Sequence, residues 1–385
     1  MILGGVASFE ERILAVSLLL APNALLERLY TGTEWGEGPV WLPGARALRW
    51  SDIPNNRILQ FHADGGRTVV YREDVEFTNG RTLDLDGAVV QCSHGRRALE
   101  REVGGEVTIL VDRWQGRRLN SPNDVVVAAD GSIWFTDPPY GIISAREGRV
   151  ADAEYDGCYV FRFDEHRGEL TPAVTDMVHP NGLAFTPDER ILYVSDTGWV
   201  VNSSAPRHIR AYDVVDGACG NGRVFAEVDE GWPDGFRVDE AGRVWSSSGD
   251  GIRVFAPDGE LVARIPVPER VANLCFGGPD GRDLYIAAAS SLYRIKTATR
   301  AAQRPPRILG ARHRRGVAEC LPGGIADGRQ RGGRRARRSG LDTAHENGHD
   351  GLPAIRRGDD ANVMPQSRKF PRLVGDDGPV RQERR

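Results

Sequence analysis

Short apolar stretches, each followed by a tight turn, recur along most of the chain. In six segments an Asn, Asp or Glu precedes a short apolar stretch. A turn follows, usually built on Asp-Gly or Pro-Asp, and then a stretch rich in β-branched and aromatic residues. This pattern predicts β-hairpins. The six leading residues are Glu37, Asn79, Asn123, Asn181, Asp234 and Asn273.

The spacing of these leading residues predicts the architecture. Successive ones lie 42, 44, 58, 53 and 39 residues apart. A four-stranded propeller blade needs about 40–50 residues, so the longer intervals indicate loop insertions. Further strand pairs follow several hairpins, for example at 57–61 and 68–71, and bring the count to four strands per unit. We therefore predict an all-β fold, a six-bladed β-propeller over residues 26–296. An irregular β-sandwich would explain the strands but not the sixfold period.

The two ends of the chain differ from this body. Residues 13–22 are apolar but follow an acidic stretch, which favours a short N-terminal helical extension over 1–25; a cleaved signal peptide is the alternative. No apolar run approaches the ~20 residues that span a bilayer, so we expect no membrane association. Residues 297–385 contain no Trp or Tyr and a single Phe, with runs of Arg and Gly. We expect this tail to be disordered.

Charge and cysteine content indicate which binding partners and which cellular compartment to expect. The net charge is −4; residues 297–385 carry 20 basic and 10 acidic side chains, hence +10, and leave −14 for the body. The Arg-rich tail predicts nonspecific attraction to nucleic acid rather than a specific partner. Five cysteines without close pairs indicate free thiols and a cytoplasmic location, the periplasm being the alternative if a signal is present. His345–His349 fits a zinc-protease pattern, but Gly348 argues against the helix that this motif needs.

In a propeller the first strand of each blade lines the central channel. The six leading residues should therefore converge near one face. Their carboxylate and amide oxygens suit a hard divalent cation. The competing explanation is that Asn and Asp begin these strands as turn residues, although Glu37 is a poor turn former. Four tryptophans at strand positions are expected in the core between blades: Trp41, Trp50, Trp134 and Trp245.

A series of short motifs, in order along the chain, resembles one family. They are Trp35-Gly-Glu-Gly-Pro-Val-Trp41, Trp50-Ser-Asp-Ile-Pro-Asn-Asn56, Arg118-Leu-Asn-Ser-Pro-Asn-Asp124, Phe135-Thr-Asp-Pro-Pro-Tyr-Gly141, Pro180-Asn-Gly-Leu183, Pro233-Asp-Gly235 and Ala272-Asn-Leu-Cys-Phe-Gly277. Over about residues 26–295 the chain resembles the gluconolactonase / regucalcin (senescence marker protein) / luciferin-regenerating enzyme family. The resemblance implies a six-bladed propeller with one divalent metal in the channel and hydrolysis of a lactone, often a sugar lactone.

Carried over to this chain, the resemblance implies specific site residues. Asn79 and Asn273 would be neighbours of the metal, and the ligands would be Glu37, Asn123, Asn181 and Asp234. Calcium is the expected ion, with Mg, Mn and Zn as alternatives. Metal-activated water would attack the lactone, with Asp234 as the general base and Asp124 or Asp137 as alternatives.

Four further residues are expected at the substrate: Arg118, Asn120, His94 and Tyr140. For each, a structural role in a turn or at the rim is the competing explanation. The alternative functions are hydrolysis of another ester, such as an organophosphate, and a non-catalytic propeller that binds a metal or a partner. The sequence does not predict the oligomeric state.

Overall fold

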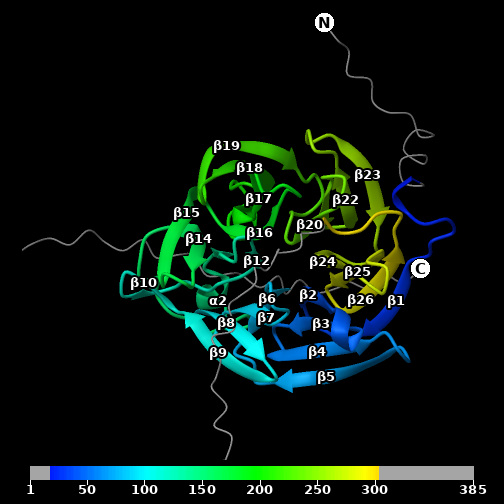
Figure 1. The fold of residues 1–385 in the computed structure, drawn as a ribbon, viewed down its shortest axis with the longest axis horizontal. Helices are drawn as coiled ribbons and strands as arrows, with labels where there is room; N and C mark the ends of the chain where they lie inside the picture. The colour runs from blue at the N-terminus through cyan, green and yellow to red at the C-terminus, as the bar shows by residue number, and fades with distance from the viewer. Residues whose placement is uncertain (1–17, 303–385) are drawn as a thin grey trace, which may run out of the picture. The chain divides into compact units, whose positions relative to one another are not determined.

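The computed structural model describes residues 18–302, which fold into six four-stranded antiparallel sheets. Viewed end on, the sheets are arranged radially, with the first strand of each nearest the centre (Figure 1). The prediction of a six-bladed β-propeller is confirmed. The predicted N-terminal extension lies largely outside the described residues. So do His345–His349 and nearly all of the predicted tail.

Each blade runs from an inner to an outer strand. Blade 1 contains β2 (Gly36–Leu42), β3 (Ala47–Asp52), β4 (Arg57–His62) and β5 (Arg67–Glu73). Blade 2 contains β6 (Thr78–Leu83), β7 (Val89–Ser93), β8 (Ala98–Val103) and β9 (Glu106–Val111). Blade 3 contains β12 (Val125–Val127), β13 (Ile133–Asp137), β14 (Cys158–Asp164) and β15 (Glu169–Met177). Blade 4 contains β16 (Pro180–Phe185), β17 (Ile191–Asp196), β18 (His208–Val215) and β19 (Ala218–Glu227). Blade 5 contains β20 (Phe236–Val238), β21 (Val244–Ser248), β22 (Gly251–Phe255) and β23 (Leu261–Pro266).

Blade 6 is assembled from both ends of the propeller. It contains β24 (Val271–Gly277), β25 (Asp283–Ala288), β26 (Ser291–Lys296) and, as its outer strand, β1 (Glu27–Thr31). β1 is antiparallel to β26, with Glu27 opposite Arg294 (Figure 1). Hydrogen bonds between the first and last strands thus close the ring without a covalent link. Without β1, blade 6 would have only three strands, and the outer edge of β26 would have no partner.

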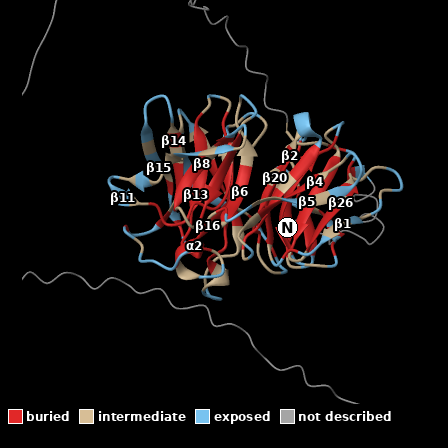
Figure 2. Cartoon of the chain, turned by 90° about the horizontal axis from the view of Figure 1, so that it is seen from below, coloured by how far each residue is buried: buried red, intermediate tan, exposed pale blue. Residues whose placement is uncertain are grey.

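Large aromatic side chains fill the space between blades. Trp50, Trp134 and Trp245 are at most 1% exposed, and Trp41 is 9% exposed. Trp134 of blade 3 packs with Leu183 and Val194 of blade 4, while Trp245 of blade 5 packs with blade 6. The prediction that these four tryptophans form the core is confirmed. Figure 2 shows the buried strands inside the molecule and the exposed residues mainly in connections and outer strands.

The insertions predicted from the two longest intervals lie at the same end of the propeller as the leading residues. In blade 3 the connection from β13 to β14 includes α2 (Tyr140–Ile143), and in blade 4 the connection from β17 to β18 includes η2 (Gly198–Val200). A small hairpin, β10 (Arg113–Trp114) with β11 (Arg117–Arg118), precedes blade 3. The connections of blades 3 and 4 therefore lie at the mouth of the channel where the leading residues begin their strands. Within residues 18–302 no helix has the length and apolar character needed to cross a bilayer.

Candidate metal and active site

The six leading side chains form a buried polar ring around the channel. Each is only 2–8% exposed. Asn273 Nδ2 donates to Glu37 Oε2 at 3.0 Å, across 236 positions of sequence, and lies 3.4 Å from Asp124 Oδ2. Asp234 lies close enough to Glu37 for its charge to shift the pKa of that carboxyl. The predicted convergence of the first strands on the axis is therefore present in the structure.

Glycine allows neighbouring blades to approach so closely. The amide of Gly80 donates to the carbonyl of Asn123 at 2.8 Å, and that of Gly182 to the carbonyl of Asp234 at 3.0 Å. A Cβ at either glycine would lie 2.4–2.5 Å from the same carbonyl oxygen, closer than real Cβ atoms come to other atoms. The two Asn-Gly pairs that begin these strands thus have a structural reason beyond turn formation.

Hydroxyl groups on the second strands hold the leading residues from the side. In three blades, a Ser or Thr on the second strand donates to the backbone carbonyl of the next blade's leading residue. The bonds are Ser51 Oγ to Asn79 O (3.1 Å), Thr136 Oγ1 to Asn181 O (2.7 Å) and Ser195 Oγ to Asp234 O (2.9 Å). The sequence analysis missed this contribution, although the repeated Ser-Asp and Thr-Asp pairs at 51–52, 136–137 and 195–196 were a readable signal.

Three buried carboxylates share the channel and repel one another. Burial raises the pKa of Glu37 well above its usual range, and the charges of Asp234 and Asp124 raise it further. Burial raises the pKa of Asp234 to about 7, with a further contribution from the charge of Glu147. Arg237 Nη1, 3.7 Å from Asp124 Oδ2, offsets part of this charge. The clustered negative charge is the electrostatic environment that suits a dication.

The amide side chains divide into those with a free oxygen and one without. Asn181 Nδ2 donates to Thr197 Oγ1 at 3.1 Å, which leaves its oxygen for another partner. Asn79 Nδ2 contacts His94 Nε2 at 3.2 Å, while its buried Oδ1 has no partner. Asn273 is used at both ends, because its Oδ1 accepts from Leu274 N at 2.8 Å.

The donor set fits a hard cation through mixed carboxylate and amide oxygens. Across residues 18–302, no group of three or more His, Cys, Asp or Glu is arranged to hold a metal. A site here therefore depends on asparagine oxygens. The orphaned Asn79 Oδ1 also makes this residue better suited than Asn273 to face a bound ion or substrate.

Arg118 and Asn120 lie in the segment that precedes Asn123. Arg118 Nη2 donates to Arg96 O at 2.5 Å, and its buried Nε has no partner. Asn120 Nδ2 donates to Asp137 O at 3.2 Å and to Gly157 O at 3.1 Å, while its buried Oδ1 is unpartnered. Each residue is thus fixed on one side and keeps a free polar atom.

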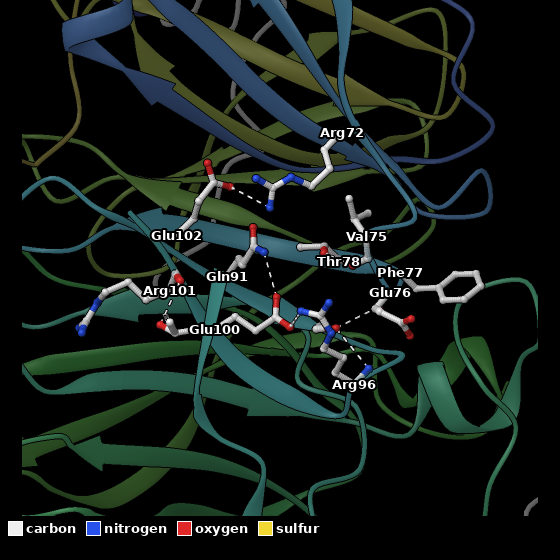
Figure 3. Close-up of polar contacts among 12 residues, drawn as sticks. Arg72, Val75, Glu76, Phe77, Thr78, Gln91, Arg96, Glu100, Arg101 and Glu102 are labelled. Carbon is white, nitrogen blue, oxygen red and sulfur yellow. Dashed lines mark hydrogen bonds and ion pairs between the residues drawn. The ribbon is translucent and has the colours of Figure 1, made fainter. Parts of the chain in front are cut away.

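A side-chain network in blade 2 supports the residue to which Arg118 is bonded. Glu100 accepts from Gln91 Nε2 and from Arg96 Nη1, each at 2.9 Å. Figure 3 shows these contacts between the adjacent strands β7 and β8 and the turn that joins them. The network holds Arg96 in place, and with it the backbone carbonyl that accepts the hydrogen bond from Arg118.

His94 and Tyr140 are buried and connect elements rather than lining open space. His94 is 0% exposed; its Nε2 contacts Asn79, and its Nδ1 contacts the carbonyl of Glu147 at 2.9 Å. Burial lowers the pKa of His94 to about 4, so the ring is neutral near pH 7. The Tyr140 hydroxyl bonds Thr197 Oγ1 at 2.6 Å, and Thr197 in turn holds Asn181.

Residues 144–150, here called the strap, bring a carboxylate that the sequence analysis missed. Arg146 pairs with Glu34 of the connection before blade 1, and Arg149 pairs at 2.9 Å with Glu76 of the connection before blade 2. Between them, Glu147 lies near enough to Asp234 to raise its pKa. The long interval between leading residues indicated an insertion here but gave no sign of where it would reach.

Asp137, an alternative general base in the sequence analysis, is bonded away from the channel. Its Oδ2 accepts from Asn120 N at 2.7 Å and from the Tyr155 hydroxyl. Asp124 instead lies beside Asn273 in the ring. Of the two alternatives, Asp124 is the one that the structure brings together with Glu37 and Asp234.

The fold and this ring define a six-bladed propeller with a polar, acidic site at one mouth of its channel. Residues 35–290 match the family described as SMP-30/Gluconolactonase/LRE-like region. The chain belongs to this family, and the family predicted from its motifs is confirmed.

Individual relatives agree with this assignment. A gluconolactonase from Zymomonas mobilis is 30% identical over 322 residues, covering 77% of this chain and 87% of the relative. The structure of a gluconolactonase from Xanthomonas campestris is 41% identical, with a TM-score of 0.69, and the match covers 74% of this chain and 92% of that one. A calcium-binding regucalcin from Agrobacterium tumefaciens shares the fold at 20% identity and a TM-score of 0.59, over 73% of this chain and 96% of that one.

Proposed function

We propose that the propeller hydrolyses a sugar lactone with the help of one divalent cation held by Glu37, Asn123, Asn181 and Asp234. The observation that carries this proposal is the ring itself: buried carboxylates that raise one another's pKa, next to asparagine oxygens. Family membership and the gluconolactonase relatives support the reaction class. Calcium is the proposed ion, because all four donors are oxygens and the regucalcin from Agrobacterium tumefaciens, which has the same fold, is a calcium-binding protein. The compartment we propose is the cytoplasm.

A bound dication supplies Lewis acidity, which polarises a carbonyl oxygen and lowers the pKa of a coordinated water. The residues around the cation position the substrate and accept the proton of the attacking water. Asp234 accepts the proton of the attacking water, and its burial against Trp232 and Asn181 fixes the carboxylate for that role. Asp124, whose Oδ2 lies 3.4 Å from Asn273 Nδ2, adds negative charge without being required as the base.

Substrate orientation falls to the residues that border the ring. Arg118 and Asn120 each keep a buried polar atom without a protein partner, which suits hydrogen bonds to sugar hydroxyls. His94 and Tyr140 act as positioning residues in this proposal. His94 holds Asn79 and the strap, while Tyr140 holds Thr197 beside Asn181.

The test is a lactone panel assayed with and without metal. The purified chain is treated with EDTA, then supplied with Ca, Mg, Mn or Zn and assayed on glucono-δ-lactone and on pentonolactones. We expect hydrolysis that EDTA abolishes and one of these ions restores. The Asp234→Asn variant should lower kcat by about 10²–10⁴-fold, the usual loss for a general base. Asp188→Asn, an exposed aspartate on a turn, is the matched control and should leave kcat unchanged.

Two results would contradict the proposal. Failure of every lactone with every ion would favour a non-catalytic propeller. Full activity in the presence of EDTA would remove the cation from the reaction.

A further inference from the structure

Two tryptophans extend the candidate site outward between blades 4 and 5. Trp199 lies in η2, two residues after Thr197, which holds Asn181. Trp232 lies two residues before Asp234, and a hydrogen bond from its side chain opposes the rise in the pKa of that carboxyl. The two rings lie 5.7 Å apart between centroids, at 34° to each other, and both are half-buried. One side of this pair therefore touches the candidate metal site while the other reaches solvent.

A guanidinium group lies over each tryptophan. Arg207, just before β18, is 5.5 Å from the centroid of Trp199, and Arg270, just before β24, is 4.4 Å from that of Trp232. Within residues 18–302, neither arginine forms an ion pair; Arg207 makes one long contact with the carbonyl of Gly231 at 3.5 Å. Cation–π contact orients both groups but leaves their positive charge unneutralised.

The carboxylates closest in sequence do not neutralise that charge. Asp229 is paired with Arg253 at 3.1 Å and with Arg264 at 2.5 Å. Glu269 accepts from Ser290 and from the Tyr293 hydroxyl, each at 2.7 Å.

Glu230, exposed on the connection that carries Trp232, forms no ion pair with any described residue. The side of the mouth formed by blades 4 to 6 thus presents two oriented cations without acidic partners.

The strap on the other side of the mouth shows the contrast. Its two arginines, Arg146 and Arg149, are each paired with a glutamate from a neighbouring blade. Ion pairing therefore accounts for the positive charge of the strap and leaves that of Arg207 and Arg270 unexplained.

We propose that Trp199, Trp232, Arg207 and Arg270 form an anion subsite that recognises the charged far end of an acidic sugar lactone. The proposal rests on the proposed function for the position of the lactone ring at Asp234. The carbon skeleton of the substrate packs against the solvent-exposed parts of the two indoles, as apolar sugar surfaces do. A carboxylate, phosphate or sulfonate on the carbon remote from the lactone carbonyl accepts hydrogen bonds from the guanidinium groups. The shared chemistry is a sugar chain with an anionic terminus.

The experiment measures binding and turnover separately. Tryptophan fluorescence follows the binding of gluconate, 6-phosphogluconate and glucarate to the wild-type chain and to an Arg207→Gln/Arg270→Gln variant, with calcium present. Hydrolysis of glucono-δ-lactone, 6-phosphoglucono-δ-lactone and a glucarolactone is measured in parallel. Arg67→Gln is the control, because Arg67 is exposed on β5, far along the sheet from the mouth, and forms no ion pair within the described chain.

We expect wild type to bind at least one of the two probes with a charged terminus about 10-fold more tightly than gluconate, the value of one charge-assisted contact. The double variant should lose that preference, through a higher Kd and KM, while its kcat on glucono-δ-lactone stays within about threefold. The phosphate and carboxylate probes distinguish which anion fits. Added salt should weaken the preference in wild type but not in the variant.

The outcomes separate the two proposals. If the charged probes bind preferentially but no lactone is hydrolysed, the subsite stands and the proposed function fails. If wild type shows no preference for the charged probes, or if the double variant retains it, the subsite is wrong whatever the activity on neutral lactones.

Discussion

Two sets of buried carboxylates lie at the same end of the propeller and differ in how many donors surround them. Asp52 and Asp196, at the ends of second strands, are well supplied. Asp196 accepts from the backbone of Val178, His179 and Gly198 at 2.8–3.1 Å. Asp52 accepts from Glu34 N, Asn55 and Arg57, each at 2.9 Å.

Glu37, one of the inner carboxylates, has fewer donors. Glu37 accepts from its neighbour Gly38 at 2.7 Å and from Asn273, and its pKa rises well above its usual range. A carboxylate saturated with N–H groups recovers the cost of burial and fixes the connection that it binds. A carboxylate without them lowers stability, and such groups are typical of functional sites. We therefore expect the outer set to stabilise the fold and the inner set to serve the reaction proposed above.

The largest test of this comparison replaces an inner glutamate. Glu37→Gln should lower lactone turnover by about 10²-fold or more, because an anionic ligand is lost. In metal-free protein the same change should raise the thermal midpoint, since it removes repulsion with Asp234 and Asp124. The measurements are kcat with calcium and thermal unfolding in EDTA.

Glu102→Gln is the matched control for this test. Glu102 is equally buried but paired with Arg49 at 2.9 Å between blades 1 and 2. We expect lower stability and unchanged kcat. The assignment of Glu37 to chemistry is wrong if its glutamine variant behaves like that of Glu102.

Removing an outer carboxylate should have the opposite signature. Asp196→Ala leaves three backbone N–H groups of the blade 4 connections without an acceptor, at about 1 kcal/mol each, so we expect a loss of about 3 kcal/mol in the free energy of unfolding. Urea denaturation measures this loss. Turnover by the folded protein should fall less than it does for Glu37→Gln. A loss of turnover without a loss of stability would place Asp196 in the inner set.

Asp137 sharpens the comparison because it belongs to the outer set by position but has few donors. Burial raises its pKa from 3.8 to about 7. The folded state therefore binds this proton more tightly than the unfolded state, and the stabilisation is present below pH ~4 and lost as the pH rises to about 7. Asn does not titrate. Asp137→Asn should thus gain stability relative to wild type across this range, by up to about 4 kcal/mol for three pKa units.

Denaturant unfolding of both proteins between pH 4 and 8 measures this difference. Burial lowers the pKa of His94 and of His179 to about 4, so their stabilising contribution is lost as the pH falls below 6.5. Because both histidines are present in wild type and variant, their effect cancels in the difference. A pH-independent difference would show that Asp137 titrates normally.

The sequence predicted the features that repeat and missed those that depend on how far a connection reaches. The sixfold pattern predicted the blades and placed Glu37, Asp234 and Asn273 at equivalent positions, because every blade repeats the same packing of four strands. The pairing of β1 with β26 occurs only once, so the repeat in the sequence could not predict it. The approach of Glu147 to Asp234 likewise depends on the path of one insertion, which local sequence does not specify.

The smallest expected effect comes from removing a hydroxyl group that holds the backbone of an inner carboxylate. Ser195 Oγ donates to the carbonyl of Asp234 at 2.9 Å, a carbonyl that Gly182 N also contacts. Ser195→Ala should cost about 1 kcal/mol in stability, the value of one buried hydrogen bond, and lower kcat a few-fold by loosening Asp234. Ser246→Ala is the control, since Ser246 is equally buried on the second strand of blade 5 but bonds only the carbonyl of Ser247. Both variants should lose similar stability in urea. If they also lose the same kcat, the hydroxyl acts through the stability of the fold and does not position Asp234.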